Sequence, residues 1–276
     1  MLQQIIVMQR RCGKCVLLLL CTLLLFQGKY TYAKSVDLPS DVKVVKNEKV
    51  MIRSMVVGMK KHKTQFSYYY EGIYKDFKKY RSISKSYTTF FDKVAREDGY
   101  ITGIVSGYCI TICGTDTKYV TFQFGYLTTK KQERQIDKRV KKIVKRIGKG
   151  SNVMRVRRAH DYLINHMSYD ENYYNPYHAF VKGKGMCMSY ALAFQRILQE
   201  MDIPCIYIKG KNHAWNMVKI GKCWYNVDVT WDDRLSGRYR YFLKSDAEFP
   251  GHKRPNSKWL SSLKKAKYSY NLSKIH

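Results

Sequence analysis

Three side chains in the second half of the chain have the chemistry of a nucleophile, a general base and an orienting acid. They are Cys187, His213 and Asp228, in that order. A thiolate attacks an acyl carbon once a neighbouring imidazole has taken its proton, and the imidazole later protonates a leaving amine. A carboxylate bonded to the imidazole fixes its tautomer and stabilises its protonated form. The three residues therefore point to acyl transfer, provided that the fold brings them together.

Cys187 stands at the start of a predicted helix. It follows Gly183 and Gly185 in "GKGMCMSYALAFQRIL", and the residues after it are apolar on nearly every side, which indicates a buried helix. The residues at 202–204, Asp-Ile-Pro, end it. The unpaired N–H groups at a helix start carry partial positive charge, which stabilises a thiolate and an oxyanion formed on a substrate carbonyl. On its own, a cysteine in this place is more often a small packed residue.

A tight hairpin is predicted to bring His213 and Asp228 together. Two runs of alternating apolar residues flank a two-residue loop at 221–222, and a glycine in the first loop position favours a type II′ turn. In that register Trp215 lies opposite Asp228, and His213 lies opposite Thr230. His213 and Asp228 then become diagonal neighbours on one face of the sheet, within reach of a hydrogen bond. A slip of one residue would put them on opposite faces.

Three motifs in this half of the chain resemble those of the transglutaminase-like superfamily. They are "HDYLINHMSYD", "GKGMCMSYALAF" and "HAWNMVKIGKCWYNVDVTWDD", which follow one another within roughly residues 130–245. The resemblance implies an α+β fold with a papain-like core, in which the helix carrying the cysteine packs on an antiparallel sheet. It implies Cys187 as the nucleophile, His213 as the base and Asp228 as the orienting acid. No cofactor is expected.

Aromatic side chains near these motifs are candidates for a substrate channel. The resemblance implies that Trp215 and Trp231 line a channel for the acyl donor or acceptor, although tryptophans on a half-buried hairpin more often fill the core. Tyr177 is a further channel candidate, and Tyr177 or His178 could supply a second donor to the oxyanion. His160, on the helix of the first motif, is expected to be a structural or surface histidine.

The sequence predicts no metal centre. It has no HExxH motif, no paired CxxC motif after residue 33 and no loop of alternating oxygen ligands, although two aspartates stand at 232–233. The cysteines leave one alternative open. A structural disulfide between Cys187 and either Cys205 or Cys223 would exclude catalysis by the thiol.

The chain divides into three predicted segments. Residues 1–33 combine a basic start, an apolar stretch at 16–26 and a small-residue cleavage site, which together predict a secretory signal peptide. That stretch is shorter than the roughly 20 residues that a helix needs to cross a bilayer. Residues 34–128 are predicted to form a small mixed α/β region, and residues 129–276 a transglutaminase-like catalytic domain.

Hydrophobic periodicity predicts several elements outside the motifs. Helices are expected at 51–59, at 87–98, at 136–147 and after Ser151, and a β-hairpin is expected around 114–117. Cys109 and Cys113 share one face of the first hairpin strand, where small buried hydrophobic side chains are expected.

The charge of the chain favours anionic partners. It has 51 basic and 21 acidic residues and a formal net charge of +30. Because export is predicted, an anionic cell-wall polymer or lipid headgroups are expected as partners, and nucleic acid is not. A solvated basic surface without a partner fits the charge about as well.

The combined prediction is a secreted or cell-surface cysteine enzyme that acts on peptide or side-chain amides through a thioester, with a protein or peptide as substrate. Hydrolysis is slightly favoured over cross-linking to a lysine amine, because many bacterial members of the superfamily look protease-like. The alternative is a non-catalytic basic binding module of the cell envelope that retains the fold. The intact set of cysteine, histidine and aspartate argues against it, since a scaffold has no need of that set.

Overall fold

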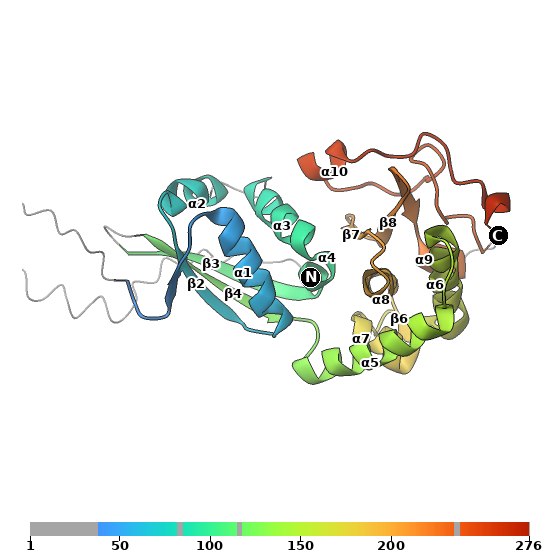
Figure 1. Cartoon of the computed structure of the whole chain (residues 1–276), viewed down its shortest axis with the longest axis horizontal. Helices are drawn as coiled ribbons and strands as arrows, with labels where there is room; N and C mark the ends of the chain where they lie inside the picture. The colour runs from blue at the N-terminus through green and yellow to red at the C-terminus, as the bar shows by residue number, and fades with distance from the viewer. Residues whose placement is uncertain (1–37, 82–84, 115–117, 235–237, 276) are drawn as a thin grey trace, which may run out of the picture.

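A computed structural model describes residues 38–275, except residues 82–84, 115–117 and 235–237. The predicted signal peptide, residues 1–33, lies outside the described residues. Figure 1 shows an N-terminal group of strands and helices on the left and a second group on the right, with helix α5 running along the lower edge between them. Within the described ranges, no helix combines the length and the apolar character needed to cross a membrane.

The N-terminal group is a sheet with helices packed on one face (Figure 1). Its strands are β1 (Val42–Val44), β2 (Gln65–Tyr69), β3 (Val105–Cys113) and β4 (Tyr119–Tyr126), and its helices are α1 (Glu48–Lys60), α2 (Ile73–Arg81), α3 (Lys85–Glu97) and α4 (Gly99–Gly103). The strand order is β1-β2-β4-β3, and only β1 and β2 are parallel. Phe66, Phe122 and Phe124 alternate with polar residues and join Met51 and Met55 of α1 in one core.

The predicted helices at 51–59 and 87–98 and the hairpin around 114–117 are confirmed by α1, α3 and the β3–β4 pairing. The burial predicted for Cys109 and Cys113 is wrong, because both side chains are only half-buried. The reason is the position of β3, which forms an edge of the sheet and so has a neighbouring strand on one side only.

The second group contains most of the helices and a separate three-stranded sheet. Its helices are α5 (Lys130–Ile147), α6 (Asn152–His166), α7 (Pro176–Lys182), α8 (Cys187–Glu200), α9 (Val229–Arg234), α10 (Lys258–Ser262) and the 3₁₀ helix η1 (Leu272–Lys274). Its strands are the short parallel pair β5 (Ser168–Tyr169) and β6 (Lys184–Gly185), and the antiparallel sheet β7 (Cys205–Lys209), β8 (Ala214–Ile220) and β9 (Cys223–Val227). The predicted helices at 136–147 and after Ser151 are confirmed.

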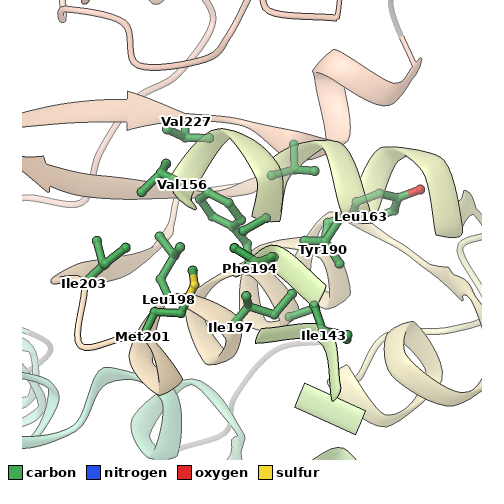
Figure 2. Packing of buried hydrophobic residues seen from close by; sticks show 14 of the residues in the cluster. Ile143, Val156, Leu163, Tyr190, Phe194, Ile197, Leu198, Met201, Ile203 and Val227 are labelled. Carbon is green, nitrogen blue, oxygen red and sulfur yellow. The ribbon is translucent and has the colours of Figure 1, made fainter. Parts of the chain in front are cut away.

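Helix α8 is the centre of this second group. Its inner residues Tyr190, Phe194, Ile197 and Leu198 are fully buried, as the apolar sequence predicts. Figure 2 shows them packed against side chains from α5, α6 and β9, including Ile143, Val156, Leu163 and Val227. Helix α8 also packs on β7 and β8. The predicted α+β fold, with the cysteine helix packed on an antiparallel sheet, is therefore confirmed.

The N-terminal group supports α8 from its remaining side. Leu192 of α8 is buried among the residues of the N-terminal core. Gly103 of α4 allows this approach, because a Cβ there would stand 2.4 Å from the Leu192 side chain. Gln199 donates a hydrogen bond of 2.9 Å to Asp98, the residue that caps α4. The helix that carries Cys187 is thus held by packing on all sides.

Candidate active site

Cys187 is the first residue of α8, and the chain before it is fixed by backbone contacts. Gly183 ends α7 in the left-handed conformation with φ 65°, and the next two residues form β6 and pair with β5. Ser189 fastens the first turn of α8 by donating a hydrogen bond of 2.8 Å to the carbonyl of Tyr173. Cys187 is 7 % exposed and packs beside Ala191 and Ala214. The thiol therefore stands at the start of a helix, as predicted.

The hairpin register predicted from the glycine at 221 is confirmed. Ile220 pairs with Cys223, and Asn216 pairs with Val227. Gly221 has φ 59°, whereas the next residue has no positive φ, which is the pattern of a type II′ turn. The predicted continuation of the second strand to Thr230 is wrong, because β9 ends at Val227 and helix α9 begins two residues later.

Asp228 lies between β9 and α9, and its side chain explains why the strand ends and a helix begins here. Its Oδ1 accepts hydrogen bonds from the backbone N–H groups of Thr230, at 3.0 Å, and Trp231, at 3.1 Å. These are bonds that a helix-capping aspartate makes, so the side chain starts α9 instead of extending the strand. Because Oδ1 is used by the helix, Oδ2 faces the hairpin.

His213 and Asp228 are joined by a hydrogen bond. His213 Nε2 lies 2.6 Å from Asp228 Oδ2, with the histidine side chain 20 % exposed and the aspartate 1 % exposed. Burial lowers the pKa of His213, but hydrogen bonds and charge interactions with Asp228 and Cys187 outweigh it and raise the pKa to about 9. His213 is thus hydrogen-bonded to the predicted orienting acid, and its pKa responds to the charge of the predicted nucleophile.

A second histidine, His252, shares the same carboxylate. Its Nε2 lies 2.8 Å from Asp228 Oδ2, and its Nδ1 lies 2.9 Å from the carbonyl oxygen of Pro250. Burial favours the neutral form of Asp228, but the hydrogen bonds from His213 and His252 reverse this and lower the pKa of Asp228. Sequence analysis missed His252, because it stands 24 residues after Asp228 and outside all three motifs.

The tyrosine that packs beside Cys187 is Tyr207 of β7. Its hydroxyl is buried and has no hydrogen-bond partner among the described residues. Burial is the main cause that raises the pKa of Tyr207, with the charge of Cys187 adding to it, so the phenol keeps its proton as a donor. Tyr177, predicted for the substrate channel, is half-buried on α7 and packs against the main core. His178, the alternative donor, stacks edge-on against Tyr173.

The two candidate channel tryptophans lie around the histidines. Trp215 is 2 % exposed and belongs to a core cluster with Met217. Trp231 is half-buried on α9, and its ring centre lies 5.1 Å from that of His213 and 4.3 Å from that of His252. Trp215 therefore fills the core, the alternative that the sequence left open, while a channel role for Trp231 and Tyr177 stays a prediction.

His160 has the structural environment expected from the sequence. It is fully buried on α6, with Nε2 at 2.9 Å from Asp232 and Nδ1 at 3.2 Å from Asp161. Asp232 lies on α9, one turn after Asp228, and its second oxygen accepts a hydrogen bond from the Tyr241 backbone. The His160–Asp232 contact therefore fixes α9, whose first turn holds Asp228.

The geometry of the His213–Asp228–His252 cluster is that of hydrogen bonds. Its ligand-type atoms all lie within 4.8 Å of one another. Two ligands at about 2.1 Å from a tetrahedral zinc ion stand about 3.4 Å apart, whereas the nitrogen–oxygen distances here are 2.6 and 2.8 Å. The cluster would have to open to take a metal ion.

The disulfide alternative is wrong for this structure. Cys187, Cys205 and Cys223 are all free thiols. Burial raises the pKa of Cys205, so that thiol stays protonated. Nothing in the bonding of Cys187 therefore prevents it from acting as a nucleophile.

The family comparison agrees with the motifs. Residues 141–229 match the model of the transglutaminase-like superfamily, which confirms the resemblance over that part of the chain. A solved structure described as a TGase is 16 % identical, with a TM-score of 0.35 over 56 % of this chain and 47 % of that chain. A proposed cysteine protease from Cytophaga hutchinsonii is 19 % identical, with a TM-score of 0.32 over 42 % of this chain and 55 % of that chain.

The matched regions cover about half the length of each of these two proteins. No curated protein matches the chain.

Proposed function

On the premise that residues 141–229 form a transglutaminase-like core, we propose that this chain is a cysteine-dependent acyl-transfer enzyme. Cys187 is its nucleophile, His213 its general base and Asp228 the acid that orients the histidine. The observation that carries the proposal is the His213–Asp228 hydrogen bond of 2.6 Å beside a free thiol at a helix start.

The proposed reaction has an acylation step and a deacylation step. The thiolate of Cys187 attacks the carbonyl carbon of an amide, and the oxyanion that forms is stabilised by N–H groups at the start of α8. His213 then gives its proton to the departing nitrogen, the C–N bond breaks, and a thioester to Cys187 remains. An acceptor loses its proton to His213 as it attacks the thioester, and Cys187 leaves as a thiolate.

The molecule that accepts the acyl group determines the class of enzyme. If the acceptor is water, the protein is a peptidase or amidase, which we favour slightly. If the acceptor is a lysine amine, the protein is a cross-linking transglutaminase. Both outcomes need the same three residues, and the partition depends on how well the thioester excludes water.

The test is to trap the thioester. The protein is incubated with glutamine-containing peptides, with and without a primary amine, and acid-quenched samples are analysed by intact mass spectrometry. An acyl adduct on Cys187 of the wild type that is released faster by the amine, and that does not form in His213→Ala, supports the proposal. Absence of any adduct or product across a peptide library, with equal results for Cys187→Ala, would favour a non-catalytic binding module.

We further propose that the protein acts outside the cell or at its surface, on a protein or peptide substrate. The apolar stretch near the start of the chain and the net charge of +30 support this. Helix α5 adds an outer face rich in lysine and arginine, with only Glu133 and Asp137 as acidic residues. An anionic cell-wall polymer or lipid headgroups would fit that face, and salt-dependent sedimentation with anionic but not neutral vesicles or polymer would support the binding.

A further inference from the structure

His252 is a buried histidine whose place beside Asp228 is not explained by the three proposed catalytic residues. Its side chain is 1 % exposed, and it comes from the segment between α9 and α10. Both Nε2 of His252 and Nε2 of His213 lie within 2.8 Å of the same carboxylate oxygen, Oδ2 of Asp228. The predicted orienting acid therefore serves two histidines at once.

The contacts of His252 require a proton on both ring nitrogens. Nδ1 lies 2.9 Å from the carbonyl oxygen of Pro250, and Nε2 lies 2.8 Å from the ionised Asp228. A carbonyl and a carboxylate only accept hydrogen bonds, so each nitrogen must donate. A neutral imidazole has one N–H group and would leave one nitrogen lone pair against an oxygen. The contacts are satisfied together by the imidazolium form.

The surroundings of His252 suit a buried cation. Its ring stacks on Phe249 with 3.8 Å between centroids, and the centroids of Trp231, Trp215 and Tyr241 lie at 4.3, 4.9 and 5.8 Å. Aromatic rings at such distances attract a cation, most strongly where water is excluded.

The ionisable groups that face His252 are few. Asp228 faces it from the start of α9, the ring of His213 lies 5.4 Å away before β8, and Tyr241 is one of the surrounding rings. Arg254, two residues along the chain, is turned to Asn226 and Asp246 instead. Among these groups, the negative charge in contact with the His252 ring is therefore the carboxylate of Asp228.

We propose that His252 is a cationic positioning residue, which holds Asp228 in place and limits how tightly Asp228 binds the proton of His213. The inference rests on the proposed acyl-transfer function and deepens it. A general acid must release its proton to the leaving amine near neutral pH, and an unopposed buried carboxylate would hold that proton too strongly. A second cation on the same oxygen offsets part of that attraction.

Two substitutions separate the charge of His252 from its hydrogen bond. His252→Gln keeps an N–H donor for Asp228 and loses the charge, whereas His252→Lys keeps the charge. The readout is the rate of Cys187 alkylation by iodoacetamide against pH, with peptide mapping, because it needs no substrate. Removal of a cation from the His252 position, 5.4 Å from the His213 ring, should move both limbs of the pH profile to higher pH. For His213 the shift is about two pH units at an effective dielectric constant of about 20.

In His252→Gln we expect both the rising and the falling limb of the plot of alkylation rate against pH to move to higher pH. In His252→Lys both limbs should return toward their wild-type positions. His62, which bonds to the carbonyl of Thr128 outside this cluster, supplies the control, and His62→Gln should leave the profile unchanged. A His252→Gln profile that superimposes on that of the wild type would overturn the proposal.

A measurement on the wild-type protein tests the proposal even if the variants misfold. Nitrogen NMR of protein labelled at its histidines should show both ring nitrogens of His252 protonated at pH 7, and a single protonated nitrogen would refute the inference. The proposed function and the proposed state of His252 are tested by separate measurements. If wild-type Cys187 is not alkylated faster than the other thiols, the proposed function fails, while the NMR result still decides the state of His252.

Discussion

Asp228 has two separable roles, and the pair of variants Asp228→Asn and Asp228→Ala distinguishes them. Its Oδ1 caps α9, and its Oδ2 holds His213. An asparagine oxygen can replace the cap but brings no charge to His213. An alanine removes both functions. Comparison of the two therefore isolates the electrostatic effect on the base from the stability of the helix.

The structure gives the expected size of each effect. Without the carboxylate, the pKa of His213 should fall from about 9 toward its ordinary value of 6.5, because only the interactions with Cys187 then oppose the effect of burial. Loss of the cap in Asp228→Ala should lower the free energy of unfolding by about 1 kcal/mol relative to Asp228→Asn. The assays are an NMR titration of the His213 ring and urea unfolding of both variants.

The raised pKa of His213 also predicts how stability depends on pH. The folded state binds the proton more tightly than the unfolded state, so this contribution is fully present below about pH 6.5 and is lost as the pH rises through about 9. Each pKa unit corresponds to about 1.4 kcal/mol, so the loss is at most about 3 kcal/mol, and Asp228→Asn should reduce it. If His213 titrates in Asp228→Asn as in the wild type, the carboxylate does not control the imidazole and the reasoning is refuted.

Three further variants test the surroundings of the site. Gly183→Ala should lower the free energy of unfolding by about 1–2 kcal/mol and slow the alkylation of Cys187, because φ is 65° and the new Cβ would meet a backbone oxygen at 2.8 Å. An unchanged urea midpoint would contradict this. Tyr207→Phe removes a buried hydroxyl without a partner, so stability should hold or rise. If that hydroxyl donates to the oxyanion, kcat should fall by about 100-fold or more, and full activity would exclude the role. His160→Leu leaves Asp232 buried without its partner and should cost about 3 kcal/mol in urea unfolding at pH 7, whereas a cost below 1 kcal/mol would show that the pair does not hold α9.

Local patterns in the sequence predicted much of the structure. The glycine at position 221 sets the turn, and the turn sets the register of β8 and β9. The apolar residues after Cys187 predicted a buried helix, because no face of that segment could remain in water. These features depend on neighbours in the chain or on one periodicity, which a single sequence displays.

The remaining features depend on contacts between distant segments. His252 belongs to no motif, and only the path of the chain after α9 brings it to Asp228. Tyr207 lies on a strand whose alternation shows which face it occupies but not that Cys187 lies above that face. The strand predicted beyond Asp228 is a helix, because a capping bond outweighed the β propensity of the valine and threonine that follow.

The most direct test of the central claim is the alkylation of Cys187 in the wild type and in His213→Ala. The rate of reaction with iodoacetamide is measured against pH, and each modified cysteine is identified by peptide mapping. An activated nucleophile should show rapid labelling at pH 7 that is confined to Cys187 and is lost in His213→Ala. Slow labelling of Cys187, equal in both proteins, would contradict an activated nucleophile and would leave a binding module as the better explanation of this fold.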